Sequence, residues 1–166
     1  MLTRIKEIVR ELNSKGVFAL LLFACLANFA FGHVRWSMTN SLNGRLFVVI
    51  PAGPYDKMRI KNDSLVVVDV LRPHGDGLVR EIKRVGCVEG QVLSVSDSFT
   101  YSCDGNPLGT AKHFDLSGKP TLKFAFNGTI PKGKLFLIGD SKDSYDSRYY
   151  GLVNVECVLA FGWKII

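Results

Sequence analysis

Apolar positions follow two different patterns along this chain. One uncharged run, GVFALLLFACLANFAFG at residues 16–32, has the ~17–25 residues that a helix needs to cross a bilayer. Beyond it, apolar residues come in short runs rich in Val, Ile, Phe and Tyr, separated by Gly, Pro, Asn and Asp. These patterns predict one N-terminal transmembrane helix followed by β structure.

The charges before the apolar run predict its orientation. An excess of basic residues marks the cytoplasmic side, and here four basic residues stand against Glu7 and Glu11: Arg4, Lys6, Arg10 and Lys15. We therefore expect a cytoplasmic segment at 1–15, an anchor at 16–32 and an extracytoplasmic domain at 33–166. A cleaved secretory signal ending near Cys25-Leu26-Ala27 remains the alternative. Both interpretations export the rest of the chain.

The exported part is predicted to be mainly antiparallel β. Candidate strands lie at 45–50, 64–70, 91–96, 99–103, 122–126, 134–139 and 155–166. The turn signals between them are PAGP, PHGDG, DGNP, SGKP and NGTIPKGK. Residues 75–86 could hold a short helical turn, but no longer helical period occurs there. One β domain therefore accounts for residues 33–166.

Composition and charge exclude some classes of protein. Hydrophobic residues make up 47% and charged residues 22% of the chain, which argues against disorder. The net charge of +6 comes from scattered basic residues rather than from a run interleaved with aromatics. A membrane surface is therefore a better partner than nucleic acid.

The cysteines suit an oxidising compartment. Cys87 and Cys103 flank a predicted hairpin, so we expect them to form a disulfide. Cys25 lies in the apolar run, and Cys157 has no assigned partner. No CxxC pair is present and the histidines available are His33, His74 and His113, so no zinc site is expected. No cofactor is expected either.

Three segments concentrate polar side chains beside predicted strands. They are WSMTNSLNGRLF at 36–47, REIKRVG at 80–86 and LFLIGDSKDSYDSRYYG at 135–151. Their order and content resemble the bacterial type I signal peptidases, and more closely the conjugative-transfer peptidases of the TraF type. The first resembles the serine box, the second the lysine box K-R-V-x-G, and the third the box GDNxxxSxDSRxxG. The resemblance spans nearly the whole chain, anchor included, and implies a Ser–Lys protease fold.

The resemblance implies a serine nucleophile activated by a lysine. A serine hydroxyl needs a base, and a lysine serves if burial lowers its pKa enough to keep it neutral near pH 7. Lys83 matches the family's base. We assign the nucleophile to Ser41, preceded by Thr39 and followed by Leu42, while Ser37 remains the alternative because Ser37-Met38 matches the serine box of the housekeeping enzymes. Asn43 stands where the transfer peptidases have proline.

The third segment is expected to support the site. By resemblance, Ser144 hydrogen-bonds the lysine, while Asp146 and Arg148 brace the site as an ion pair. Asp140 and Asp143 are interpreted as turn formers. The implied function is a serine endopeptidase of the bacterial inner membrane, with its catalytic domain in the periplasm, that removes signal peptides from exported preproteins.

The substrate implied most directly is a conjugative prepilin, which is either hydrolysed or cyclised. The alternatives are a general signal peptidase and a non-catalytic membrane-tethered component of a secretion or conjugation apparatus. The oligomeric state is not predicted.

Overall fold

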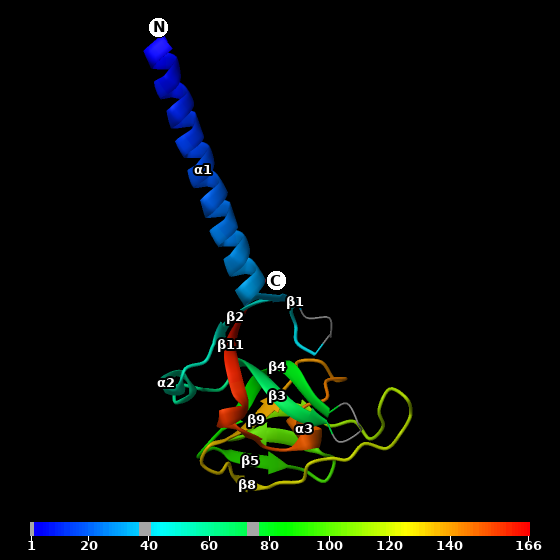
Figure 1. Cartoon of the computed structure of the whole chain (residues 1–166). Coiled ribbons are helices and arrows are strands. Elements are labelled where there is room, and N and C mark those ends of the chain that lie inside the picture. Colours follow the sequence, from blue (N-terminus) through cyan, green and yellow to red (C-terminus); the bar gives the residue numbers. More distant parts are fainter. Residues whose placement is uncertain (1, 37–40, 73–76) are drawn as a thin grey trace. The chain divides into compact units, whose positions relative to one another are not determined.

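The computed structural model describes residues 2–36, 41–72 and 77–166. Two compact units divide the chain, Met1–Val34 and Arg35–Ile166. The first is helix α1 (Leu2–His33), shown in blue in Figure 1. Its segment Asn13–His33 has a mean hydropathy of 1.8 and is long and apolar enough to cross a membrane.

The second unit is mainly β and contains a seven-stranded sheet (Figure 1). From edge to edge its strands are β1 (Val34–Trp36), β2 (Leu46–Pro51), β11 (Val158–Lys164), β3 (Leu65–Arg72), β4 (Gly77–Val88), β9 (Lys134–Ile138) and β10 (Val153–Asn154). In this spatial order, each pair of neighbouring strands between β2 and β10 is antiparallel. Short helices α2 (Pro54–Lys57), α3 (Ser147–Tyr150) and η1 (Val155–Cys157) lie between strands.

A second sheet has four strands, also antiparallel. Their order is β7 (Asn106–Thr110), β6 (Thr100–Cys103), β5 (Val92–Val95) and β8 (Gly128–Thr129). A two-residue turn at Asp104-Gly105 joins β6 to β7, and both residues have positive φ, as such hairpin turns require. Cys87 on β4 is bonded to Cys103 on β6, so the predicted disulfide is confirmed and links the two sheets.

Two hydrophobic clusters form the core. One lies under the larger sheet around Val66, Val68 and Leu137, and the other joins the sheets around Leu93, Tyr101 and Phe136. Alternate residues of a strand face one side, which places Val66, Val68 and Val70 together in the first cluster. The same alternation decides where the side chains of β4 point.

Several predicted elements differ from the structure. Residues 122–126 are not a strand, because Phe124 and Phe126 pack against the second cluster and the N–H of Phe124 donates to the carbonyl of Arg148 at 2.9 Å. The prediction of a short helical turn within 75–86 is wrong, because β4 begins at Gly77 and continues through this stretch. Residues 75 and 76 lie outside the described part of the chain. The predicted strand at 155–166 divides into η1 and β11.

Candidate active site

Ser41 lies in a turn that precedes β2 and is half-buried. The burial of one side chain and two hydrogen bonds hold this turn in place. Leu42 is only 6% exposed, and the backbone N–H of Asn43 donates to Asp140 Oδ2 at 3.0 Å. The carbonyl of Ser41 also accepts from the backbone N–H of Ser141 at 3.2 Å. The serine is therefore tied to the segment that follows β9.

Lys83 lies in the middle of β4 and is 2% exposed. It stands opposite Val66 of β3, and because directly opposed residues share a face, its side chain points to the side where Val66 and Val68 are buried. Burial in apolar surroundings disfavours the charged form of an amine. The side-chain carboxylate of Glu81 lies 3.3 Å from Lys83 Nζ, and a carboxylate at that distance favours the charged form of the amine.

Three polar atoms from distant segments meet at this point. Lys83 Nζ is 2.5 Å from Ser41 Oγ and 2.9 Å from Ser144 Oγ, and the two hydroxyl oxygens are 2.8 Å apart. Each distance is short enough for a hydrogen bond, and the contact between Lys83 Nζ and Ser41 Oγ is the shortest of the three. The structure thus brings together the predicted nucleophile, the predicted base and the predicted supporting serine. The alternative nucleophile, Ser37, lies outside the described residues.

The segment from Gly139 to Arg148 is fixed onto the end of β9 by its own side chains. Asp146 caps α3 by accepting from the backbone N–H of Arg148, and its Oδ2 accepts from the N–H of Gly139 at 2.8 Å. Ser147 Oγ accepts from the N–H of Leu137 at 2.8 Å. A Cβ added at Gly139 would lie 2.1 Å from Ser144 Oγ and 2.6 Å from the carbonyl oxygen of Ser41, so glycine is required there. This packing sets the position of Ser144.

Asp146 and Arg148 form the predicted ion pair. Arg148 Nε and Nη2 donate to the two carboxylate oxygens at 2.8 and 2.7 Å, the bidentate geometry that suits a guanidinium. Both side chains are buried. Burial lowers the pKa of Arg148, but the hydrogen bonds and negative charge of Asp146 outweigh it, so that the pKa is raised overall. Arg148 also donates to the carbonyls of Thr110 and Ser141, joining the site to the smaller sheet.

Sequence reasoning missed three contributors to this arrangement. Asp140 is more than a turn former, because it binds Arg84 as well as the turn of Ser41. Ser147 was not singled out, although it lies between Asp146 and Arg148 in the third box. The third is Glu81. It lies two residues before Lys83 on a strand, and this spacing places the two side chains on the same face, which is the signal that could have identified it. Asp143, the other expected turn former, is paired with Lys112.

An open pocket adjoins the turn of Ser41. Its walls combine apolar and charged residues and include Trp36, Leu42, Arg45, Asp140 and Lys164.

Comparison with known proteins places the chain in a family of serine peptidases. Residues 9–161 match the family described as signal peptidase, peptidase S26, and the chain belongs to that family. It is also similar to a conjugal transfer protein TraF of Agrobacterium fabrum (strain C58 / ATCC 33970), with 38% identity over 72 residues. That match covers 42% of this chain and 39% of the relative, so it spans well under half the length of the relative. The type I signal peptidase resemblance and the link to TraF are thus confirmed.

A solved structure gives a weaker likeness. A signal peptidase I from Enterococcus faecalis V583 superposes with a TM-score of 0.38 and is 22% identical, covering 60% of this chain and 92% of that one.

Proposed function

We propose that this chain is a membrane-anchored serine endopeptidase that uses a Ser41–Lys83 pair to remove signal peptides from exported proteins. The observation that carries the proposal is the 2.5 Å contact between Ser41 Oγ and a buried Lys83 Nζ. It is supported by membership of the signal peptidase family. Surface lysines seldom lose their charge, whereas a buried amine beside a hydroxyl fits general-base chemistry.

In the proposed reaction, neutral Lys83 takes the proton of Ser41 as the serine oxygen attacks a substrate carbonyl. The tetrahedral intermediate collapses to an ester, and the leaving amine takes the proton from the Lys83 ammonium. Water then attacks the ester while Lys83 accepts its proton; the ester C–O bond breaks, the acid product leaves and the Lys83 ammonium returns the proton to the Ser41 oxygen. Ser144 holds the lysine through its hydroxyl, and Asp146 with Arg148 holds Ser144 through the packed segment around it. The backbone N–H of Ser41 is the proposed donor to the oxyanion.

The proposed substrate is a signal-bearing exported protein, and the similarity to a conjugal transfer protein favours a conjugative prepilin among such proteins. The substrate would lie extended across the pocket beside Ser41. Helix α1 would be retained as the anchor at residues 16–32 in the bacterial inner membrane, with residues 1–15 cytoplasmic and 33–166 periplasmic.

A non-catalytic membrane-tethered component of a conjugation or secretion apparatus is the second candidate. One observation favours it: Asn43 stands two residues after Ser41, where the catalytic transfer peptidases have proline. In that case the Ser–Lys contact would persist without turnover.

Processing of a co-expressed conjugative prepilin distinguishes the two candidates. We expect Ser41→Ala and Lys83→Ala to abolish processing by the full chain, while Ser37→Ala keeps part of it. Exposed residues supply the matched controls Ser98→Ala and Lys119→Ala, which should process normally. The unchanged chain would also be tested on a general signal-bearing preprotein. If it processes neither that preprotein nor the prepilin, the peptidase assignment is rejected. Processing by Ser41→Ala but not by Ser37→Ala would move the nucleophile and leave the class unchanged.

A further inference from the structure

Glu81 lies beside the Ser–Lys contact although no motif marks it. It precedes Lys83 by two residues on β4, so the two side chains project from the same face. Glu81 Oε2 is 3.3 Å from Lys83 Nζ, and the side chains are 7% and 3% exposed, respectively. Val68 and Val66, both fully buried, stand opposite them on β3. A carboxylate therefore shares a largely apolar environment with the amine.

The position of Glu81 matters because the charged and neutral forms of Lys83 have different roles in the proposed reaction. The ammonium donates hydrogen bonds to Ser41 and Ser144 but cannot accept a proton, whereas the neutral amine can. A carboxylate within 4–6 Å favours the charged form, and low dielectric surroundings strengthen the attraction. Glu81 thus counteracts the effect that apolar burial alone would have on the lysine.

We infer that Glu81 is a positioning residue of the Ser–Lys site, which directs Lys83 Nζ toward Ser41 and holds the amine protonated in the resting protein. This inference rests on the proposed function. Lys83 then acts as a base only after its ammonium has released a proton to water. Glu81 consequently sets the pH below which the peptidase is inactive.

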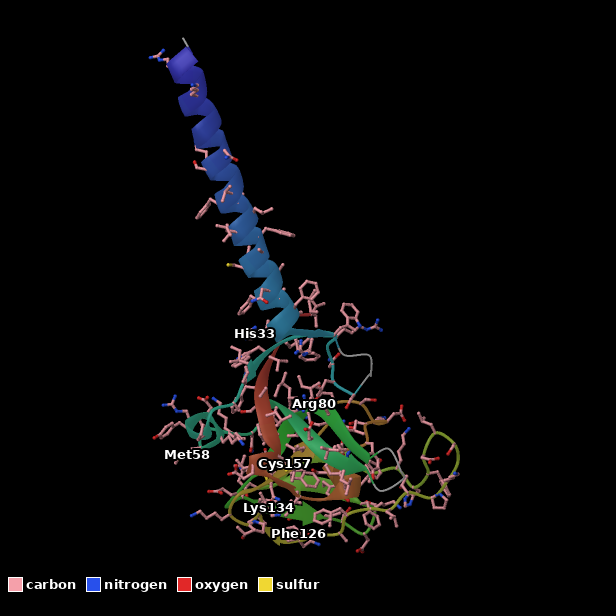
Figure 2. The ribbon with its side chains drawn as sticks, in the orientation of Figure 1. His33, Met58, Arg80, Phe126, Lys134 and Cys157 are labelled. Atoms are coloured by element: carbon pink, nitrogen blue, oxygen red, sulfur yellow. A yellow bond between two sulfur atoms is a disulfide. The ribbon has the colours of Figure 1, made fainter. Side chains whose placement is uncertain are left out.

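Several charged groups on β4 and on the elements beside it pair with one another. Arg80 projects from the opposite face of β4, where it pairs with Asp69 at 2.8 Å; Figure 2 labels Arg80. Arg84 pairs with Asp63 and Asp140, and Asp146 pairs with Arg148. Further titratable groups on the elements packed nearby are Lys57, Lys134, Asp143, Tyr145, Tyr149, Tyr150, Glu156 and Cys157. Of the carboxylates in the described ion pairs, Glu81 is the one that contacts Lys83.

A direct titration tests the inference without relying on catalysis. The full chain in detergent micelles, labelled with ¹³C at lysine Cε, would be followed by NMR as the pH is raised, with the Lys83 signal assigned by its loss in Lys83→Arg. We expect Glu81→Gln, which keeps the shape of the side chain, to lower the pH midpoint of Lys83 by about one unit or more. Asp69→Asn, at the exposed pair on the other face, is the control and should leave the midpoint unchanged. An unchanged midpoint in Glu81→Gln would overturn the inference.

The pH dependence of kcat/KM is the second measurement. We expect Glu81→Gln to shift the acid limb to lower pH, so that its rate at the foot of the limb rises about tenfold relative to the unchanged chain. Glu81→Asp, which keeps the charge on a shorter side chain, should restore much of the original profile. If Glu81→Gln does not fold, Glu81→Asp should itself show a smaller shift in both measurements, and no shift would count against the inference.

The two assays separate this inference from the proposed function. If the chain cleaves its substrate but Glu81→Gln leaves the acid limb of the pH profile unchanged, the role of Glu81 is rejected and the proposed function stands. Absence of cleavage by every variant, with the Lys83 midpoint still moved by Glu81→Gln, rejects the peptidase activity and leaves the coupling between Glu81 and Lys83 intact.

Discussion

Asp140 joins Arg84, the residue after Lys83, to the turn that carries Ser41. Its Oδ1 accepts from Arg84 Nε at 3.0 Å, and its Oδ2 accepts from the backbone N–H of Asn43 at 3.0 Å. The carboxylate therefore connects the strand of the proposed base to the loop of the proposed nucleophile, independently of the hydroxyl contacts between them.

Replacing Asp140 by Asn should impair catalysis more than folding. One of its two oxygens becomes an NH₂ group, which would face a donor on either Asn43 or Arg84. We expect kcat/KM for signal-peptide cleavage to fall about tenfold, or ~1.4 kcal/mol of transition-state stabilisation. Since the side chains of Arg84 and Asp140 are 28% and 33% exposed, the free energy of unfolding should change by less than about 1 kcal/mol. A large loss of stability with normal turnover of the folded fraction would contradict this.

Gly139→Ala should inactivate the site by steric conflict. The added Cβ would overlap Ser144 Oγ and the Ser41 carbonyl oxygen, so the backbone or these two serines must shift, which disturbs their contacts with Lys83. We expect cleavage to fall at least 100-fold, or ~2.7 kcal/mol, in a chain that still folds. Gly86→Ala is the matched control, because its nearest atoms are side-chain carbons of Ile138 and Leu108 at 3.2–3.3 Å, which can shift slightly. Equal activity of the two variants would show that the 139–144 segment adapts.

The Asp146–Arg148 pair should matter for folding. Removing one partner of a buried pair leaves an uncompensated charge, which typically costs ~3–5 kcal/mol. We therefore expect Asp146→Asn to lower the free energy of unfolding by about that amount in denaturant titrations. Glu156→Gln is the control: its side chain is 89% exposed and its contact to Lys57 is 3.5 Å, so stability should not change measurably. Similar stabilities of the two variants would contradict a structural role for the buried pair.

The general architecture was predictable because it depends on local patterns. The uncharged run at 16–32 and the Val-, Ile- and Phe-rich runs indicate a helix and strands without reference to the rest of the chain. Residues 122–126 show the limit of this approach. LKFAF alternates like a strand, yet Phe124 and Phe126 pack against the core cluster between the sheets, and residues 122–126 form no strand.

The meeting of Ser41, Lys83 and Ser144 was predictable only through the family boxes. These residues are 42 and 61 positions apart, and their contact depends on strand order and on the register of β3 with β4. The roles of Asp140 and Glu81 follow from the same three-dimensional facts. Arg84 lies opposite Ile138, which brings it close to Asp140, and no local pattern contains that register.

The Cys87–Cys103 disulfide should stabilise the fold while leaving the site in place. It closes a loop with a sequence separation of 16, for which chain-entropy arguments give about 3 kcal/mol. We expect reductant to lower the free energy of unfolding by roughly this amount. Cys157→Ser should respond to reductant like the unchanged chain, because Cys157 is not in a disulfide. The double variant Cys87→Ala/Cys103→Ala should show no response, and a persistent response would reject the assignment.

Tyr101 should make stability fall at alkaline pH. It is fully buried on β6, and its hydroxyl donates to the carbonyls of Phe124 at 2.7 Å and Arg148 at 3.1 Å. Burial raises the pKa of Tyr101 to about 12, from an ordinary value of about 10. Between these values the unfolded chain has released the phenolic proton that the folded chain keeps, so this contribution to stability is complete below pH ~10 and is lost as pH rises toward ~12.

Comparing Tyr101→Phe with the unchanged chain isolates this effect from the titration of lysines. At pH 8 the variant should be less stable by ~1 kcal/mol, because the carbonyl of Phe124 loses the hydroxyl that donates to it, while the carbonyl of Arg148 keeps the N–H of Phe124 as a donor. As pH rises above 10 the unchanged chain loses stability faster, so the difference between the two should shrink and then reverse. Denaturant midpoints at pH 8, 10 and 11 would measure it. Tyr55→Phe is the control, since Tyr55 is 82% exposed and its replacement should leave the slope unaltered. A constant difference between Tyr101→Phe and the unchanged chain at all three pH values would mean that the phenol ionises equally in both states, and would contradict its burial between the two sheets.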